Sequence, residues 1–453
     1  MRSICLASAL ASTMGLGLVS STPTSTDPEQ PNKRASLPTV TVSGNAFWQG
    51  STRFYVRGVD YQPGGSSAMK DPLADTTGCQ RDVSEFKKLG INAIRVYMVD
   101  NSVNHDTCMK ALADAGIYVI IDANNPLYSI NRDSPAESYN TKYLQSVFAT
   151  IDEFIKYDNT LAFFSGNEVV NDSLNSTLSA LYVKATTRDM RQYIVNRGYR
   201  KVPVGYSAAD VSQNRMQLAQ YMNCGAEDER SDFFAFNDYS WCNSNFETAG
   251  WAYKVKNFTG YGIPVFLSEY GCKTNGRDFG EVAALMSSEM TAVYSGGLMY
   301  EYALGENGYG IVKISDSDSV SEQPEFAKFS SALVANPAPT GDGGATRSTS
   351  SVPCPTKDDY WLVDSTDLPA MPDGAKVLMV DGAGIGPGLK GDGSQNVGST
   401  STESGSISSP TTMTTPFNSK NAAGMTTTGS VDKAPLIITG LVMVLTLTGT
   451  LLL

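Results

Sequence analysis

The sequence predicts a closed (β/α)8 barrel, because short runs of β-forming residues alternate with amphipathic helical patterns through most of the chain. Eight such runs and the helical patterns between most of them fill about 250 residues, the usual size of this fold. An open, doubly wound sheet has the same alternation, but it normally carries a glycine-rich nucleotide-binding turn after its first strand. Here that turn reads GVDYQPGG, with neither a G-x-G-x-x-G pattern nor a phosphate-binding lysine. The barrel is therefore favoured.

The expected barrel strands are short and rich in Val, Ile, Phe and Tyr. They cover residues 53–60, 91–97, 118–122, 161–167, 202–206, 233–237, 264–269 and 297–302. The expected helices have apolar residues at three- and four-residue spacing, and they cover residues 84–90, 108–116, 148–158, 183–198 and 281–296. The first two end at Gly90 and Gly116, as helix C-caps commonly do. This order predicts a parallel sheet covered by helices.

The two ends of the chain indicate a secreted, lipid-anchored protein. Residues 1–20 carry one basic residue and then an uncharged run of apolar and small residues, as in a secretory signal peptide. Residues 434–453 are uncharged and mostly apolar, and a polar spacer separates them from the small residues 421–423. This is the layout of a GPI-attachment signal, with Asn421 as the expected anchor residue and the hydrophobic tail removed. A single-pass tail anchor is the alternative. The GPI signal places the protein on the extracellular face of the plasma membrane, with the cell wall as a further destination.

Composition divides the rest of the chain. Residues 41–336 have the mixed apolar, aromatic and charged composition of a catalytic domain. Residues 337–385 are expected to form a linker and a short accessory segment tied back by Cys354. Residues 386–433 are dominated by Gly, Ser, Thr and Asn, which predicts a disordered Ser/Thr-rich stalk that carries the attachment site.

The cysteines predict disulfides and argue against a metal site. Cys5 lies in the expected signal peptide, which leaves an even number in the mature chain and favours three disulfides. No two cysteines have the short spacing of a zinc site, and His105 is the only histidine, so no metal or cofactor is expected. The remaining cysteines are Cys79, Cys108, Cys224, Cys242, Cys272 and Cys354.

Charge and sequons agree with an extracellular protein. The formal net charge is −12 and no basic cluster is present, which argues against a nucleic-acid partner. Asn171, Asn175 and Asn257 stand in N-x-S/T sequons and are the expected glycosylation sites.

Two predicted strands end in a glutamate. Glu168 follows the fourth strand, after Asn167, and Glu269 ends the seventh. In this fold the chemistry takes place where the strands end and the βα loops begin. Each glutamate alone could be a first-turn acid that stabilises the next helix dipole. Two at equivalent positions favour catalysis, because glycosidic cleavage requires one protonated and one ionised carboxyl group.

Six motifs in order extend this interpretation. They are GVDYQP at 58–63, DPLAD at 71–75 followed by Cys79, NAIRVY at 92–97, FFSGNEV at 163–169, FLSEYGC at 266–272 and GGLMYEY at 296–302. With these motifs, residues 40–354 resemble glycoside hydrolase family 72, the GPI-anchored fungal cell-wall β-1,3-glucanosyltransferases. The GPI-type tail fits the same resemblance.

The resemblance implies a retaining double displacement with Glu269 as nucleophile and Glu168 as acid and then base. A second β-1,3-glucan chain would accept the glycosyl group through the 3-hydroxyl at its non-reducing end. The alternatives are a hydrolytic β-glucanase on the same fold and a non-catalytic glucan-binding wall protein. Donor-subsite residues carried over by motif are Gln62, Tyr97, Asp122, Asn167, Tyr239 and Tyr300. Glu301 is left out because strand alternation turns it away from Tyr300, and His105 is expected to be structural.

The resemblance also implies the disulfide pairing. It pairs Cys79 with Cys108, Cys224 with Cys354 and Cys242 with Cys272, and the second pair would tie the post-barrel piece to the barrel. Some family members carry a further cysteine-rich carbohydrate-binding module. This chain lacks the cysteines for it, so glucan binding is expected from the barrel alone.

Overall fold

The computed structural model describes residues 37–65, 68–315, 319–364 and 367–395. The predicted signal peptide at 1–20, the anchor residue Asn421 and the hydrophobic tail at 434–453 lie outside the described residues. The same holds for the predicted stalk beyond residue 395. No helix in the described part of the chain combines the length and apolar character that a membrane crossing requires.

Eight parallel strands close into a barrel, with neighbours in the order β10-β11-β4-β5-β6-β7-β8-β9. This confirms the predicted (β/α)8 fold. The barrel strands are β4 (Val56–Asp60), β5 (Ala93–Val96), β6 (Tyr118–Asp122), β7 (Thr160–Asn167), β8 (Val204–Ala209), β9 (Phe233–Asp238), β10 (Val265–Tyr270) and β11 (Tyr294–Met299).

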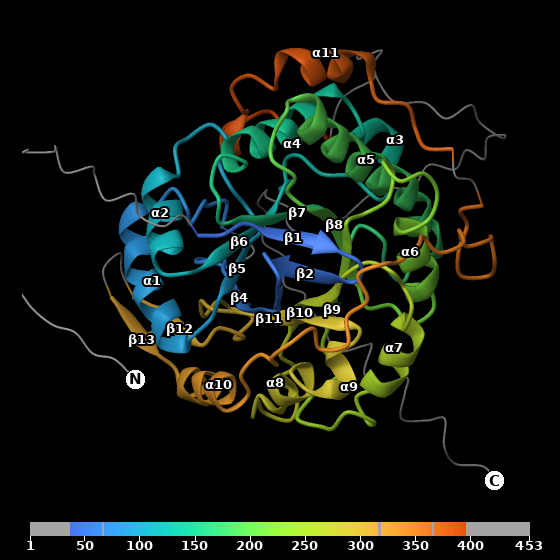
Figure 1. Cartoon of the computed structure of the whole chain (residues 1–453). Helices are drawn as coiled ribbons and strands as arrows, with labels where there is room; N and C mark the ends of the chain where they lie inside the picture. Colours follow the sequence, from blue (N-terminus) through green and yellow to red (C-terminus); the bar gives the residue numbers. More distant parts are fainter. Residues whose placement is uncertain (1–36, 66–67, 316–318, 365–366, 396–453) are drawn as a thin grey trace, which may run out of the picture. The chain divides into compact units, whose positions relative to one another are not determined.

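Helices surround the barrel in Figure 1. Gly90 ends α1 in the left-handed conformation, with φ 77°, as the sequence predicts. Gly116, with φ 78°, follows α2 directly after its C-cap residue. The helices up to residue 335 are α1 (Thr76–Leu89), α2 (Asp106–Asp114), α3 (Pro135–Ser138), α4 (Thr141–Phe154), the 3-10 helix η1 (Leu174–Ser179), α5 (Ala180–Asn196), α6 (Arg215–Met222), α7 (Trp251–Phe258), α8 (Gly280–Leu285), α9 (Ser288–Thr291) and α10 (Pro324–Ala335).

Predicted and observed elements differ most where the barrel closes. The predicted last strand, 297–302, is instead β11, which begins at Tyr294. A Cβ on Gly296 would lie 2.0 Å from the Val56 carbonyl oxygen, so β11 needs glycine to pair with β4. Glycine has a low β-propensity, so the first residues of β11 were not recognised as part of a strand from the sequence. The predicted helix 281–296 divides into α8 and α9, because the chain is extended at Ser287.

The N-terminal end of the barrel is closed by an antiparallel sheet that the sequence analysis did not predict. It consists of β1 (Val40–Ser43), β2 (Ala46–Gln49) and β3 (Thr52–Phe54), and β1 and β2 cross the barrel opening in Figure 1. The predicted first strand, 53–60, is therefore divided between β3 and β4. Phe47 of β2 packs against Phe233 and Phe266 at 5.8 Å between ring centroids.

The lower interior of the barrel is apolar. It is the fully buried cluster of Phe47, Phe164, Phe233 and Phe266, in which the centroids of contacting rings lie between 5.4 and 6.0 Å apart. Tilted and edge-on aromatic pairs of this kind stabilise a core beyond the area that they bury. The cluster forms a solid base beneath the site.

The upper interior, nearer the C-terminal ends of the strands, is polar. Its inward-facing residues bond to one another: Ser207 Oγ lies 2.8 Å from Ser268 Oγ, which in turn donates to Asn237 Oδ1 at 2.8 Å. Buried polar groups are stable only when such partners satisfy them. The upper interior consists of Arg95, Asp122, Ser207, Asn237 and Ser268, all buried.

After α10 the chain continues as a segment that we call the belt, residues 337–395. It begins near the N-terminal end of the barrel, where Asp342 O accepts from Arg53 Nη1 at 2.6 Å. The disulfide Cys224–Cys354 then joins it to the segment after α6. Two further short elements, β12 (Val312–Ile314) and β13 (Val320–Glu322), form a hairpin just before α10.

The second half of the belt packs along the outside of the barrel. Trp361 is fully buried and lies 5.6 Å from Tyr221 between ring centroids. Helix α11 (Asp373–Asp381) packs on α4 and α5, as Figure 1 shows, and the 3-10 helix η2 (Gly388–Lys390) follows. Contact with the barrel continues through Gln395, whereas the sequence placed the start of the stalk at residue 386.

Residues 386–395, which the sequence predicts as the start of the stalk, pack on the barrel because their glycines allow it. Glycines in a Gly-rich stretch indicate a flexible chain by composition, but here they allow close packing. A Cβ on Gly386 would lie 2.2 Å from Asn101 Oδ1, and one on Gly391 would lie 2.2 Å from the Tyr128 hydroxyl. Residues 386–395 therefore belong to the folded part of the chain.

Candidate active site

Glu269 is buried near the end of β10 and is surrounded by donors. The residue is 8% exposed, Tyr97 donates to Oε1 at 2.8 Å and Tyr239 donates to Oε2 at 2.6 Å. Arg95 Nη1 lies 3.3 Å from Oε1. Burial raises the pKa of Glu269 to about 7, Arg95 opposes this shift, and the charge of Glu168 adds to it. The two tyrosine hydroxyls also favour the ionised form. Both oxygens of this carboxylate are thus held in fixed directions.

Glu168 follows β7 in an unusual backbone conformation. Its φ is 48°, in the left-handed region that residues with side chains seldom adopt. The backbone is held there because its N–H donates to Ser207 O at 2.9 Å and Arg132 donates to its carbonyl oxygen. Asn237 Nδ2 donates to Glu168 Oε1 at 2.8 Å. This conformation turns the carboxyl group into the cleft that Glu269 also lines.

Arg95 is the charged centre of the upper interior, and the sequence analysis missed it. It is 0% exposed and forms a bidentate pair with Asp122 at 2.9 Å on both sides. Its guanidinium also lies 4.6 Å from the centroid of Phe164, the aromatic residue of the lower interior beneath it. Asp122, predicted as a sugar ligand, lines the cleft but has both oxygens bound by Arg95. Its main contact in this structure is therefore with the arginine.

Asn167 and Gln62 lie where the sequence predicts. Asn167 Oδ1 accepts from Ser207 Oγ at 2.7 Å and from Asn237 Nδ2 at 3.3 Å. These two bonds fix its amide plane and direct the amide nitrogen the other way, so it can donate to a sugar hydroxyl. Gln62 lines the same cleft and is half-buried.

Four tyrosines form an aromatic wall beside Glu269. Tyr300 lies 6.5 Å from Tyr97, 6.2 Å from Tyr239 and 5.5 Å from Tyr309 between ring centroids. Burial raises the pKa of Tyr97 and Tyr239 well above the ordinary value. They therefore keep their protons and act as donors to Glu269. The sequence predicted three of these residues and missed Tyr309.

The cleft joins these residues into one site. Beyond the predicted residues and the two glutamates, its lining consists of Met98, Asn124, Asn125, Pro126, Ser129, Ile130, Asn131, Arg132, Val169 and Gln395. Most of these belong to the long segment that connects β6 to α3. Tyr239 is not part of this lining but contacts it through Glu269.

Two carboxyl groups near the site lie beneath its surface. Asp60 is fully buried at the end of β4, and neither oxygen has a hydrogen-bond partner within the described residues. Burial raises its pKa well above the ordinary value, and the nearby charge of Arg95 opposes this shift. Glu301 is also fully buried, and Asn307 donates to it at 2.7 Å. Neither lines the cleft, in agreement with the omission of Glu301.

Disulfides and a histidine brace the surrounding loops. The structure contains Cys79–Cys108, Cys224–Cys354 and Cys242–Cys272, the pairing that the sequence resemblance implies. Cys242–Cys272 joins the loop after β9 to the segment after β10, close to Tyr239 and Glu269. His105 is buried, 2.7 Å from Asp71 and 2.8 Å from Glu153. It lies outside the cleft lining, as expected for a structural residue.

The three sequons lie outside the cleft lining. Asn175 is exposed in η1, whereas Asn171 and Asn257 are half-buried. Glycan attachment at these residues stays a prediction.

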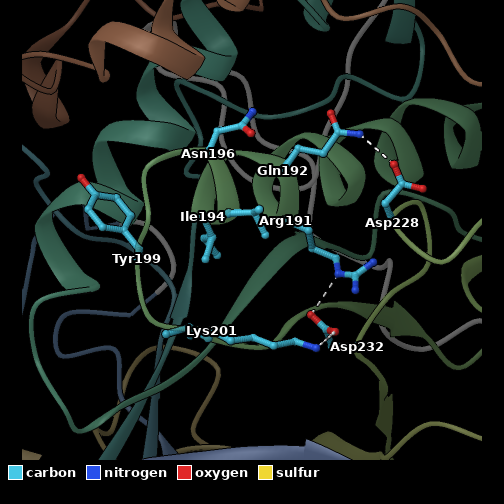
Figure 2. A pocket seen from close by; sticks show the side chains of 10 residues that line it. Arg191, Gln192, Ile194, Asn196, Tyr199, Lys201, Asp228 and Asp232 are labelled. Carbon is cyan, nitrogen blue, oxygen red and sulfur yellow. Dashed lines mark hydrogen bonds and ion pairs between the residues drawn. The ribbon is translucent and has the colours of Figure 1, made fainter.

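A second hollow lies at the opposite end of the barrel strands (Figure 2). Lys201, three residues before β8, and Asp232, directly before β9, line it. Figure 2 shows Arg191 and Lys201 both directed at Asp232, at 3.2 and 3.8 Å. These charges neutralise one another, and neither catalytic candidate lies here. The cleft with the two glutamates is therefore the candidate active site.

Comparisons with known proteins agree with this assignment. A family model described as "Glucanosyltransferase" matches residues 30–336. The 1,3-beta-glucanosyltransferase gel1 of Aspergillus fumigatus is 60% identical over 360 residues, covering 79% of this chain and 79% of the relative. The 1,3-beta-glucanosyltransferase GAS5 of Saccharomyces cerevisiae is 49% identical over 370 residues, or 79% of this chain and 75% of that protein.

Solved structures are similar over the same region. A mutant of Saccharomyces cerevisiae Gas2p in complex with laminaritetraose and laminaripentaose superposes with a TM-score of 0.70 at 37% identity. The match covers 75% of this chain and 76% of that one.

Proposed function

Because the chain belongs to the glucanosyltransferase family, we propose that it is a retaining β-1,3-glucanosyltransferase. It cleaves a β-1,3-glucan internally and transfers the newly formed reducing end to the non-reducing end of another glucan. One observation carries the proposal on this chain: Glu269, with both oxygens held by tyrosine hydroxyls, lines one cleft together with Glu168. The names of the relatives support the substrate and the transfer reaction.

In the first step Glu269 attacks the anomeric carbon of the donor. The bond between that carbon and the glycosidic oxygen breaks, and Glu168 gives its proton to the departing oxygen. A glycosyl ester of Glu269 remains, and the fragment with a free 3-hydroxyl leaves. Tyr97, Tyr239 and Arg95 support this role, because they orient the attacking carboxylate and favour its charged form.

In the second step Glu168, now ionised, takes the proton of the acceptor 3-hydroxyl. The acceptor oxygen attacks the anomeric carbon, Glu269 leaves as a carboxylate, and the β configuration is restored. Asn237 holds one oxygen of Glu168 in place for both steps. Asn167 is positioned to donate to the sugar 2-hydroxyl, a bond that strengthens in the transition state.

Transfer in place of hydrolysis requires an acceptor site that holds sugar better than water reaches the ester. Tyr97 and Tyr300 of the aromatic wall line the cleft and support such a site, because aromatic rings pack on pyranose rings and exclude water. A hydrolytic glucanase would use the same pair of glutamates. The products decide between the two activities.

The test is an incubation with one pure β-1,3-linked oligosaccharide, followed by separation of the products by length. Transfer yields chains both longer and shorter than the input. Only shorter chains would establish hydrolysis and contradict the proposal. A protein that merely binds glucan would leave the input unchanged.

We further propose that the protein is held on the extracellular face of the plasma membrane by a GPI anchor at or near Asn421. The signal-like residues 1–20, the tail at 434–453 and the sequons support this location. Phosphatidylinositol-specific phospholipase C should release the protein from intact cells. A known GPI-anchored protein released in parallel serves as the control. If this protein stayed in the membrane while the control was released, the proposed GPI anchor would be contradicted.

A further inference from the structure

The belt reaches the catalytic cleft at Gln395. Residues 337–395 begin near the N-terminal end of the barrel and follow its outer surface, and Gln395 lines the cleft that also holds Glu168 and Glu269. A segment outside the barrel proper thus contributes a polar side chain to the site.

The end of the belt is fixed by specific contacts. The Ser394 N–H donates to Leu127 O at 2.9 Å, and Asn140 Nδ2 donates to Ser394 O at 3.1 Å. Ser394 is 0% exposed, and the Gly393 N–H donates to the Tyr128 hydroxyl at 3.2 Å. These bonds attach the belt to the segment between β6 and α4, which forms one side of the cleft.

The side chain of Gln395 has a defined orientation. Its Nε2 donates to Pro126 O at 3.1 Å and to the Ser129 hydroxyl. The amide oxygen stands on the opposite side of the amide plane from the nitrogen, and the side chain is half-buried. An oriented amide oxygen at the wall of a cleft is a suitable acceptor for a sugar hydroxyl.

The position of Gln395 indicates which sugars it meets. It contacts Pro126 and Ser129, whereas the residues that bond to Glu269 are Tyr97, Tyr239 and Arg95. Gln395 bonds to none of these three residues. Gln395 is thus held by the Pro126–Ser129 side of the cleft, and we expect a sugar bound there to occupy a different subsite from the sugar at Glu269, so that a longer chain is needed to fill both.

We propose that Gln395 is a glucan-binding residue that makes the enzyme select longer chains, with the belt acting as the element that carries it into the cleft. This inference rests on the proposed function. It assigns to the post-barrel segment a direct part in substrate binding, whereas the sequence assigned glucan binding to the barrel alone.

The test compares Gln395→Ala and Gln395→Met with Gln145→Ala in the full chain. Gln145 is the matched control, because its Nε2 also donates to two belt carbonyl oxygens, Ala383 O and Ile385 O, both at 2.9 Å, but it lies outside the cleft lining. Methionine keeps the length of glutamine and removes its amide. Initial rates of transfer are measured with β-1,3-linked oligosaccharides of increasing length, and thermal unfolding checks that each variant is folded.

Both Gln395 variants should lower kcat/KM about fivefold for the longer oligosaccharides, chiefly through a higher KM, as expected for one lost hydrogen bond. Activity on the shortest transferable chain should stay unchanged, and Gln145→Ala should match the wild type at every length. Equal loss at all lengths, no loss at any length, or the same loss in the control would overturn the proposal. Failure of the proposed function would give a different result, because the wild type itself would then produce no chains that are longer than the input.

Discussion

The lower and upper interiors of the barrel share strands β9 and β10 but follow opposite physical rules. In the lower interior, Phe164, Phe233 and Phe266 fill space and pack on one another through their rings. In the upper interior, the five side chains that form it are held by directed bonds, such as the bidentate pair of Arg95 and Asp122. Close packing of the rings fixes the shape of the lower interior, whereas hydrogen bonds fix the orientation of the polar groups in the upper interior.

The two regions also differ in their energetic cost. Burying aromatic rings stabilises the fold directly. Burying a guanidinium with carboxylates costs desolvation free energy that the pairing only partly offsets. Changes in the lower interior should therefore act chiefly on stability, whereas changes in the upper interior should also act on Glu269.

Loss of a catalytic carboxylate should have the largest effect. Glu269→Gln and Glu168→Gln should each lower transfer by roughly 10²–10⁴-fold or more, because one removes the nucleophile and the other the acid. The unfolding midpoint should stay close to that of the wild type. Substantial turnover in either variant would contradict the assigned roles.

A change in the lower interior should act on stability. Phe266→Ala should lower the free energy of unfolding by about 3–5 kcal/mol, because it leaves a cavity among closely packed rings. Denaturant titration measures this loss. At a temperature where the variant is folded, kcat should remain within a few-fold of the wild type, and a selective loss of kcat would show that the two interiors are not separable.

Arg95→Met should affect both properties, because Arg95 joins the two interiors. It leaves Asp122 buried without its partner, which should cost about 3–5 kcal/mol of stability. It also removes the positive charge that lowers the pKa of Glu269, so the acid limb of the kcat/KM profile should move to higher pH. An unshifted acid limb would show that Arg95 does not set the charge of Glu269.

Tyr239→Phe isolates a single hydroxyl of the upper interior. The ring and its contacts with Tyr300 remain, but the 2.6 Å bond to Glu269 is lost. Since that bond favours the carboxylate, the acid limb should again move to higher pH, by less than in Arg95→Met. The matched control is Tyr309→Phe, because no hydrogen bond joins Tyr309 to Glu269 and its acid limb should stay in place.

A buried charge far from the glutamates should affect stability alone. Burial opposes a charge on His105, but its hydrogen bonds with Asp71 and Glu153 raise its pKa to about 9. A raised folded pKa gives stability that is fully present below about pH 6.5 and is lost as the pH rises through about 9. The difference in free energy of unfolding between wild type and His105→Gln should therefore shrink over this range. A constant difference would show that the ring is not charged.

Much of the lower interior and of the strand order could be predicted from sequence, because apolar strand residues and helix-capping glycines are local signals. That Glu168 and Glu269 lie in one cleft could also be predicted, since Glu168 follows one apolar predicted strand and Glu269 ends another. Arg95 was missed although it stands two residues before Tyr97, and strand alternation directs both inward. Asn237, at the end of the sixth predicted strand, carried the same strand-end signal as the glutamates.

Other parts of the site have no local signal. Gln395 reaches the cleft only because the belt follows the barrel surface from Cys354 onward. The last part of the belt, residues 386–395, has the composition of a flexible stalk. The packing of Gly386 and Gly391 against distant side chains depends on the tertiary fold, which composition does not reveal. The N-terminal sheet was missed because its first two strands precede the first recognisable βα repeat.

The central claim is that the upper interior makes Glu269 the nucleophile, and trapping the glycosyl-enzyme tests it most directly. A β-1,3-linked disaccharide with fluorine at C2 and a fluoride leaving group forms the ester quickly and releases it slowly. After proteolysis and mass spectrometry, the account predicts one added disaccharide on the peptide that contains Glu269, and none in Glu269→Gln. A label on the peptide that contains Glu168, or inactivation without a covalent adduct, would contradict it.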